Sequence, residues 1–255
     1  MTTPHPAHQL FDLTGKVALV TGGSRGLGRE MSLAFAAAGA DVVVASRKLD
    51  SCAGTVAEIE TMGRRGLAHA CHVGVWKDLD ALVEAAYARF GKIDVLVNNA
   101  GMSPLYPTLD QVSEELWDKV LAVNLKGPFR LSALVGSRMQ RGEGGSIINV
   151  SSIAAERPTP TETPYAAAKA GLNAITVAFA HAYGPKVRVN AIQAGPFLTD
   201  ISKAWSSQVE EYLAARSALA RAGRPKEVVG TALYLASAAS SFTTGAVIRV
   251  DGGQT

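Results

Sequence analysis

The sequence predicts an α/β fold built around a parallel sheet. Short apolar runs rich in β-branched residues recur along the chain with helix-forming segments between them. This is typical of strands buried on both faces and joined by crossover helices. The first run, 17–20 (VALV), leads directly into a glycine-rich turn, 21–28 (TGGSRGLG), and then into an Ala-rich helical segment, 29–38. A strand, a glycine turn and a helix start create a site where backbone N–H groups bind phosphate. An ordinary tight turn is the alternative, because glycines alone are a weak signal.

Composition narrows the class of protein. Hydrophobic residues make up 47% of the 255 residues, so the chain can bury a large core, and the net charge is only +3. Lys and Arg are scattered, which gives no indication of nucleic-acid binding. Cys52 and Cys71 are too few for a disulfide framework, lack metal-ligand spacing and fit reduced thiols. Because the sequence has no apolar run of about 18 residues and no signal-peptide pattern, we expect a cytoplasmic protein without a membrane anchor.

Six further strands and five further helices are predicted along the chain. The strands are expected at 41–45, 67–73, 93–97, 146–152, 187–193 and 244–250. The helices are expected at 79–90, 113–139, 165–180, 198–217 and 225–237, with a bend at Gly127-Pro128 in the second. Residues 1–9 are polar and are expected to form a flexible tail, which leaves 10–255 as a single domain.

The end of the second predicted strand indicates which dinucleotide the chain binds. An acidic residue at this place holds the 2′-hydroxyl of the NAD ribose, whereas an arginine accommodates the 2′-phosphate of NADP. This chain has Ser46 followed by Arg47, and Arg25 lies within the glycine turn. Two guanidinium groups that converge on one phosphate favour NADP(H) over NAD(H). The alternative is that both arginines are solvated surface residues.

Together with the glycine turn, four further motifs resemble the short-chain dehydrogenase/reductase (SDR) family in its compact, single-domain branch. They are Asn98-Asn99-Ala100-Gly101 after the fourth strand, Asn124 in a helix, Ser152 at the end of the fifth strand and the pair Tyr165 and Lys169. The resemblance covers residues 13–253. It implies a doubly wound (Rossmann) seven-stranded parallel sheet flanked by helices, and hydride transfer between a nicotinamide cofactor and a carbonyl or alcohol.

The pair Tyr165 and Lys169 indicates acid/base chemistry. Side chains at i and i+4 of a helix share one face, and an ammonium beside a phenol is expected to lower the pKa of the phenol. The resemblance implies that Tyr165 exchanges a proton with the substrate oxygen and that Ser152 polarises the same oxygen. It further implies that Lys169 holds the nicotinamide ribose, and that Asn124 holds a water that links Lys169 to solvent.

The resemblance also implies a cofactor site drawn from several strand ends. Three positions depart from the family pattern: His72 replaces an aspartate, Ala155 replaces a glycine, and the usual Pro-Gly turn is shifted to Gly195-Pro196. The expected cofactor-binding residues are Gly22, Ser24, Arg25, Gly26, Leu27, Gly28, Ser46, Arg47, His72, Val73, Asn99, Ala100, Gly101, Tyr165, Lys169, Gly195 and Thr199.

Three functions compete at this point. The leading one is NADPH-dependent reduction of a ketone or 3-oxoacyl group, and the second is oxidation of a sugar or polyol, with NAD as an alternative cofactor. The third is a cofactor-binding regulator without turnover, against which the intact set of Asn124, Ser152, Tyr165 and Lys169 argues. The substrate pocket is expected to involve Ser103, Pro104, Ala154, Ala155, Glu156 and a mobile lid at about 198–217.

One helix face points to self-association. Residues 166–180 are apolar or small nearly all round, whereas a helix that lies on a sheet buries only one face. Either the chain itself covers the other face or a partner subunit does. Because SDR proteins dimerise through this helix and the preceding one, the resemblance implies a homo-oligomer, a dimer or a tetramer.

Overall fold

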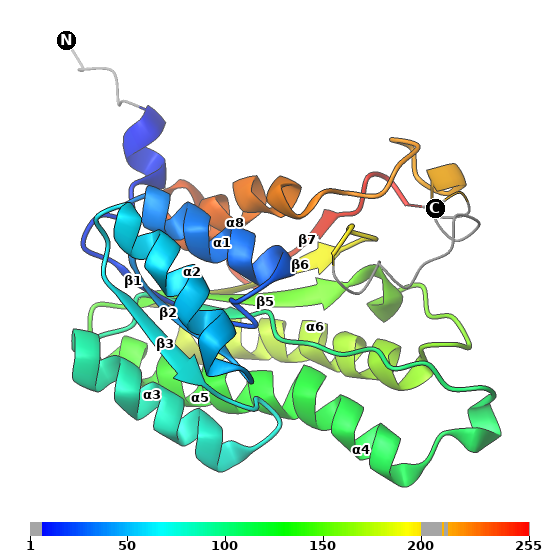
Figure 1. The fold of residues 1–255 in the computed structure, drawn as a ribbon. Coiled ribbons are helices and arrows are strands. Elements are labelled where there is room, and N and C mark those ends of the chain that lie inside the picture. The colour runs from blue at the N-terminus through cyan, green and yellow to red at the C-terminus, as the bar shows by residue number, and fades with distance from the viewer. Residues whose placement is uncertain (1–6, 200–210, 212–213, 255) are drawn as a thin grey trace.

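The computed structural model describes residues 7–199, 211 and 214–254. A seven-stranded parallel sheet with helices on both faces forms its centre (Figure 1). The spatial order of the strands is β3-β2-β1-β4-β5-β6-β7, so the winding direction reverses between β1 and β4. The strands are β1 (Val17–Thr21), β2 (Asp41–Ser46), β3 (Gly66–Ala70), β4 (Val95–Asn98), β5 (Gly145–Ser152), β6 (Val187–Ala194) and β7 (Val247–Val250). The predicted doubly wound fold is confirmed.

Alternation along the strands divides the core into two layers. In β1, Ala18 and Val20 pack with α1 (Gly26–Ala37), α2 (Leu49–Thr61) and α8 (Val229–Ala236). Val17 and Leu19 point to the opposite face because successive strand side chains alternate. There they pack with α3 (Trp76–Phe90), α5 (Gly127–Arg141) and α6 (Thr163–Tyr183). Every β1 residue is buried, as the continuous apolar run predicts.

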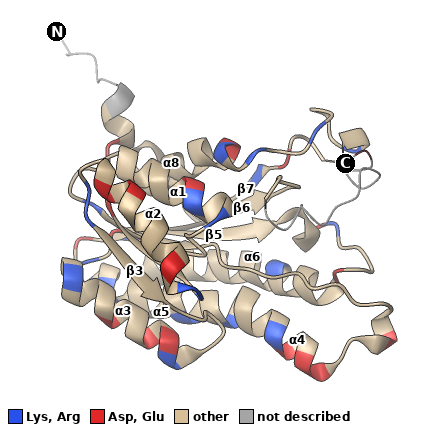
Figure 2. Ribbon diagram, in the orientation of Figure 1, with Lys and Arg blue, Asp and Glu red and all other residues tan. Residues whose placement is uncertain are grey.

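Short helices complete the described structure. They are the 3-10 helices Ala7–Phe11, Leu109–Gln111, Ile153–Ala155, Pro225–Val228 and Ala238–Ser240. The first begins within the stretch expected to be a flexible tail. Within the described residues, no helix is long and apolar enough to cross a membrane. Acidic and basic side chains are mixed over the outer helices and loops (Figure 2).

The helix expected at 113–139 is interrupted before the predicted bend. It consists of α4 (Glu114–Leu121), a π-helical turn (Ala122–Lys126) and α5, in which Pro128 occupies the first turn. Lys126 and Gly127 keep right-handed helical dihedral angles, so the chain stays helical from the π turn into α5 across Pro128. The π turn contains Asn124. Such turns often occur at functional sites because they present backbone and side chains differently from a regular helix.

The third strand is shorter than predicted, and one helix was not predicted. β3 ends at Ala70 rather than at residue 73, because the chain turns away there. The His72 backbone N–H donates to the Asp78 carboxylate at 3.0 Å, and the Gly74 N–H donates to His72 Nδ1 at 3.2 Å. These local hydrogen bonds take the place of the hydrogen bonds to β2 that a longer β3 would form. The unpredicted helix is α2, which packs Cys52, Val56 and Ile59 into the core.

Candidate active site

The glycine turn brings the backbone unusually close to the end of β4. Gly22 has φ of +64°, and a Cβ atom there would lie 2.8 Å from Asn99 Nδ2. A Cβ atom on Gly28 would overlap the carbonyl oxygen of Gly22 and the Asn99 amide. Gly26 also has a positive φ, +53°, and faces Thr199. Only glycine therefore fits this turn, which leaves an open backbone surface at the start of α1.

The first turn of α1 is a suitable anion site. The residue that precedes it, Arg25, has extended backbone and makes no side-chain capping hydrogen bond. The N–H groups of Gly26, Leu27 and Gly28 lie in the first helical turn, where an α-helix offers no acceptor four residues earlier. Such donors and the positive end of the helix dipole bind phosphate. These residues fit the pyrophosphate of a dinucleotide.

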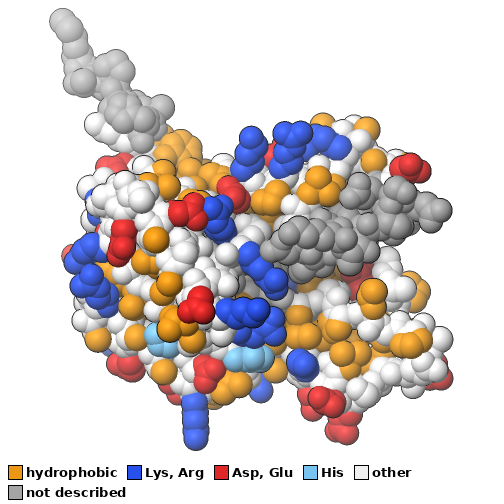
Figure 3. Space-filling view, viewed as in Figure 1, with side chains coloured by type: hydrophobic (Ala, Val, Ile, Leu, Met, Phe, Trp, Pro, Cys, Tyr) orange, Lys and Arg blue, Asp and Glu red, His pale blue; other side chains and the backbone are white. Residues whose placement is uncertain are grey.

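Hydroxyl and guanidinium groups gather beside this turn. Ser24 donates from its hydroxyl to the Ser46 hydroxyl at 3.0 Å, which joins the turn to the end of β2. Arg25 and Arg47 are both exposed, and neither forms an ion pair with any described residue. In the space-filling view, basic side chains gather near the middle of the face on which α1 and α2 begin (Figure 3). This arrangement fits an anionic group next to the ribose end of a dinucleotide.

The end of β4 is fixed to β1 by polar contacts. Thr21 Oγ1 accepts hydrogen bonds from the backbone N–H groups of Asn99 and Ala100 at 3.0 and 3.2 Å. The Asn99 side chain donates to the carbonyl oxygens of Thr21 and Gly22 at 2.9 and 3.3 Å. Asn98 donates to Asn149 on β5 at 2.8 Å. These amides position the backbone where the strand order reverses, the place at which open α/β sheets bind ligands.

The remaining expected cofactor residues lie around the same carboxyl edge. Val73 is buried, and a side chain on Gly127 would overlap its carbonyl oxygen, so that the turn after β3 packs against the start of α5. His72 contacts Gly74, which in turn faces Ala122 in the π turn. Gly195 follows β6 and lies against Asp251, where a Cβ atom would come within 2.6 Å of Asp251 Cα.

The four expected catalytic residues converge at the ends of β5 and α6 and at the π turn. Lys169 is 3% exposed, donates from Nζ to the Val150 carbonyl oxygen at 2.7 Å and lies 5.5 Å from the centre of the Tyr165 ring. Ser152 ends β5, and its hydroxyl oxygen accepts the Ala154 N–H at 3.2 Å. Gly101 lies between Asn124 and Lys169. A Cβ atom at Gly101 would be 2.9 Å from Asn124 Oδ1 and 3.7 Å from Lys169 Nζ.

The expected lowering of the Tyr165 pKa is wrong for this structure. Burial raises the pKa of Tyr165 to about 12, and the negative charge of Glu162 adds to the rise. A hydrogen bond with Ser152 acts in the opposite direction. Burial also lowers the pKa of Lys169 to about 8, because the Lys169 ammonium loses hydration. Desolvation therefore sets the direction of both pKa changes, while Lys169 Nζ donates to the Val150 carbonyl and lies beside the Tyr165 ring.

Asn124 is held by bonds within the protein. It is fully buried, and its Nδ2 donates to the carbonyl oxygens of Met102 and Val120 at 2.8 and 2.9 Å. Its Oδ1 accepts the Met102 N–H at 3.2 Å. Both amide hydrogens are thus in use, and only one lone pair of Oδ1 remains for a water. The side chain ties the π turn to the segment after β4.

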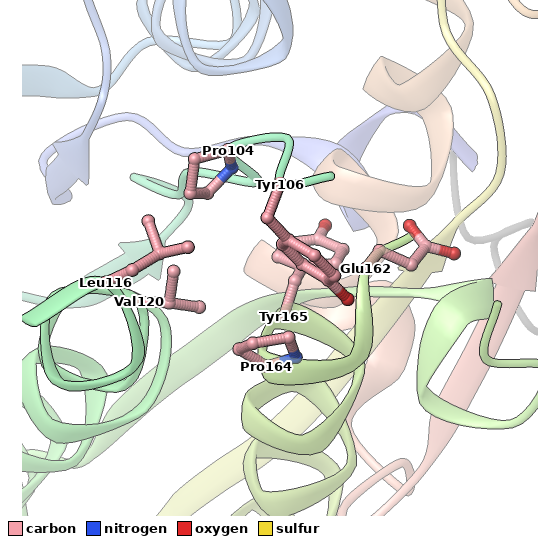
Figure 4. Close-up of a pocket in the computed structure, with 7 residues that line it drawn as sticks. All are labelled: Pro104, Tyr106, Leu116, Val120, Glu162, Pro164 and Tyr165. Carbon is pink, nitrogen blue, oxygen red and sulfur yellow. The ribbon is translucent and has the colours of Figure 1, made fainter. Parts of the chain in front are cut away.

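A small pocket lies beside Tyr165 (Figure 4). Of the expected pocket residues, only Pro104 lines it. The sequence did not indicate the other lining residues: Tyr106, Leu116, Val120, Glu162 and Pro164. Tyr106 joins the segment after β4 to the start of α6. Its hydroxyl donates to the Pro160 carbonyl at 2.6 Å and accepts the Thr163 N–H at 2.7 Å. The lid expected at 198–217 lies largely outside the described residues.

Comparisons with known proteins agree with this geometry. A family model described as enoyl-(acyl carrier protein) reductase matches residues 22–255. The short chain dehydrogenase/reductase astE of Aspergillus oryzae is 40% identical over 96% of this chain and 97% of its own length. The 3-oxoacyl-[acyl-carrier-protein] reductase FabG of Thermotoga maritima is 37% identical over 94% of this chain and 98% of its own.

Two solved structures have the same fold over nearly their whole length. A 7α-hydroxysteroid dehydrogenase in complex with NADH has a TM-score of 0.94 at 33% identity and covers 98% of each chain. A gluconate 5-dehydrogenase from Burkholderia cenocepacia in complex with NADP has a TM-score of 0.92 at 32% identity, over 97% of this chain and 98% of its own. The chain belongs to the short-chain dehydrogenase/reductase family. It is an SDR oxidoreductase that acts on alcohol or carbonyl groups with a nicotinamide cofactor.

Proposed function

We propose that this SDR reduces a ketone with NADPH, and that 3-oxoacyl compounds are among its substrates. The observation that carries the proposal is the placement of Ser152, Tyr165 and Lys169 around one point at the carboxyl edge of the sheet, next to the pocket. Oxidation of a sugar or polyol would use the same residues in reverse. A regulator without turnover would need no such set.

Each residue has a separate role in this proposal. The bound nicotinamide supplies the hydride. Tyr165 gives its proton to the substrate oxygen, and its raised pKa keeps that proton in place at neutral pH. Because the Ser152 oxygen already accepts the Ala154 N–H, the Ser152 O–H is left to donate to Tyr165 or to the same substrate oxygen. Lys169 keeps two N–H groups beyond the one bonded to Val150, and these can hold the ribose hydroxyls.

A screen of cofactor absorbance tests the reaction class. Ketones and 3-oxoesters are offered with NADPH or NADH, and sugars and polyols with NADP⁺ or NAD⁺. Oxidation of NADPH by a ketone or 3-oxoester supports the proposal. Turnover confined to sugars or polyols would instead assign the oxidative function, and no turnover with any pair would leave the regulator.

The cofactor preference rests on Ser46, Arg25 and Arg47. We expect NADPH to bind at least tenfold more tightly than NADH, because a hydrogen bond to a charged group contributes on the order of 1.5–3 kcal/mol and tenfold corresponds to about 1.4 kcal/mol. The double variant Ser46→Asp with Arg47→Ile should reverse the order, because the new carboxylate repels the 2′-phosphate and accepts from a 2′-hydroxyl. Fluorescence titration with both cofactors measures this.

Lys186→Gln is the matched control for the loss of a positive charge. Lys186 precedes β6 at the opposite edge of the sheet, where its ammonium donates to the Gly142 carbonyl. We expect this variant to keep the wild-type ratio of dissociation constants. Equal constants for the two cofactors in the wild-type protein, or tighter NADH, would refute the NADP preference.

We further propose that the exposed faces of α5 and α6 meet a second subunit, in a dimer or a tetramer. Ala167, Ala170, Ala174, Val177 and Ala178 form one exposed apolar face of α6. Phe129 on α5 is 43% exposed and packs at 5.5 Å on Phe179. We expect an oligomer in analytical ultracentrifugation at micromolar concentration, and Val177→Glu should shift it toward monomer because a carboxylate in an apolar interface is costly. A wild-type monomer would contradict the proposal.

The cytoplasmic location and the single domain with a lid stay predictions. Cys52 and Cys71 are both buried and free, which fits a reducing compartment.

A further inference from the structure

We propose that Glu162 binds a positively charged group of the substrate, so that the ketone reduced by this SDR carries an ammonium group close to its carbonyl. The proposal rests on the proposed ketone reduction for the position of the carbonyl. Binding of the cation itself does not require turnover.

The pocket beside Tyr165 has an apolar end and a carboxyl end. Leu116 and Val120 lie on one side of the two tyrosine rings, and Glu162 lies on the other (Figure 4). Glu162 is the single charged side chain among the seven residues that line this pocket. A substrate whose carbonyl oxygen reaches Tyr165 therefore has apolar surface on one side and a carboxylate on the other.

Glu162 has no counter-ion within the described part of the chain. Its carboxylate accepts hydrogen bonds from the Thr159 backbone and from the Thr159 hydroxyl, which lies 3.2 Å from Oε1, and no described Lys or Arg pairs with it. Other buried carboxylates are neutralised: Asp41 pairs with Arg64 and Arg65, and Asp94 with Lys16 and Lys92. A partly buried carboxylate without a counter-ion is unfavourable, and a ligand cation would supply the counter-ion.

The charge of Glu162 affects Tyr165, the proposed proton donor. Burial raises the pKa of Glu162, and the negative charge of Glu162 in turn contributes to the raised pKa of Tyr165. Because Glu162 and Tyr165 line the same pocket, one substrate can contact both side chains. The same field disfavours an anionic substrate at this place, because two negative charges in a partly buried site repel each other strongly.

A structural role for Glu162 is the competing explanation. Glu162 directly precedes α6, and a negative charge near a helix N-terminus stabilises the helix. However, the Glu162 side chain makes no capping hydrogen bond to an α6 N–H group. A purely structural charge would change binding of all substrates alike, whereas a binding site discriminates by the charge of the substrate.

Three methyl ketones of matched shape separate these explanations. Each carries, at the end of a three-carbon chain, a trimethylammonium group, its neutral isostere tert-butyl, or a carboxylate. The dissociation constants of all three for the enzyme–cofactor complex are measured by calorimetry, and kcat/KM is measured for those that are reduced. In the wild-type protein we expect the cationic ketone to bind at least tenfold more tightly than the neutral one, and the anionic ketone to bind most weakly.

Variants of Glu162 test the assignment to this residue. Glu162→Gln should reduce the ratio of cationic to neutral affinity at least tenfold, while Glu162→Asp, which keeps the charge, should retain most of it. Glu115→Gln removes an exposed carboxylate from α4 and should leave the ratio unchanged. Because the ratio compares ligands on one protein, a general effect of the substitution on Tyr165 or on folding cancels.

Two results would overturn the proposal. One is equal binding of the cationic and neutral ketones by the wild-type protein, and the other is an unchanged ratio in Glu162→Gln. If no ketone is reduced but the cationic probe still binds in a Glu162-dependent way, the proposed reaction fails while the cation site stands.

Discussion

Tyr165→Phe is expected to lower kcat for ketone reduction by about 10²–10⁴-fold while the protein stays folded. The substitution keeps the ring that lines the pocket and removes only the hydroxyl that gives the proton. Ser152 remains to polarise the substrate oxygen, so some activity should persist. Steady-state kinetics with saturating ketone and saturating NADPH measures the loss.

Tyr87→Phe provides the matched control. Tyr87 lies on α3 against Arg138, and the same hydroxyl is removed at a place unrelated to the pocket. We expect wild-type kcat for this variant and unchanged circular dichroism for both. Near wild-type kcat in Tyr165→Phe would show that another group supplies the proton.

Lys169 is expected to make reduction sensitive to alkaline pH. Its pKa is lowered to about 8 from the ordinary lysine value of 10.5, so its positive charge is present below about pH 8 and is lost as the pH rises through that value. Tyr165 keeps its proton over the same range, because its pKa is raised to about 12. The rate of reduction should therefore fall above about pH 8 through loss of the ammonium, not of the tyrosine proton.

Two substitutions separate the charge of Lys169 from its packing. Lys169→Met removes the charge and the bond to Val150, and we expect kcat to fall by about 10²–10³-fold at pH 7. Lys169→Arg stays protonated, so its pH profile should lack the fall near pH 8 even where its absolute rate is lower. Profiles of kcat against pH for both proteins measure this. An identical fall near pH 8 in wild type and Lys169→Arg would assign the titration to a different group.

Much of the fold could be predicted because its signals are local. The apolar run of β1 and the glycine turn determine the start of the sheet within a few residues, and the closeness of Gly22 and Gly28 to Asn99 explains why glycine is needed there. The end of β3 could not be predicted, because it depends on hydrogen bonds to Asp78 and within the turn at His72. The π turn around Asn124 likewise depends on bonds to Met102, 22 residues away.

The site was predicted less completely than the fold. Motifs identified Ser152, Tyr165 and Lys169, but the pKa values of Tyr165 and Lys169 depend on burial, which the spacing of these two residues does not reveal. The pocket joins the segment after β4, α4 and the start of α6, so its lining follows from packing between distant segments. The sequence could have indicated Glu162 as a pocket residue, because it lies three residues before Tyr165 and directly precedes the same helix.

Isotope transfer to an enone tests the central claim most directly, because an enone offers both a carbonyl and a carbon–carbon double bond to the hydride. NADPH that carries deuterium at the transferred position of the nicotinamide is incubated with the protein and the enone, and the product is analysed by nuclear magnetic resonance. We predict an allylic alcohol with deuterium on the carbinol carbon, formed by the wild-type protein and at least a hundredfold more slowly by Tyr165→Phe. A saturated ketone with deuterium at the β-carbon, or deuterated alcohol formed equally fast by both proteins, would contradict carbonyl reduction with Tyr165 as the proton donor.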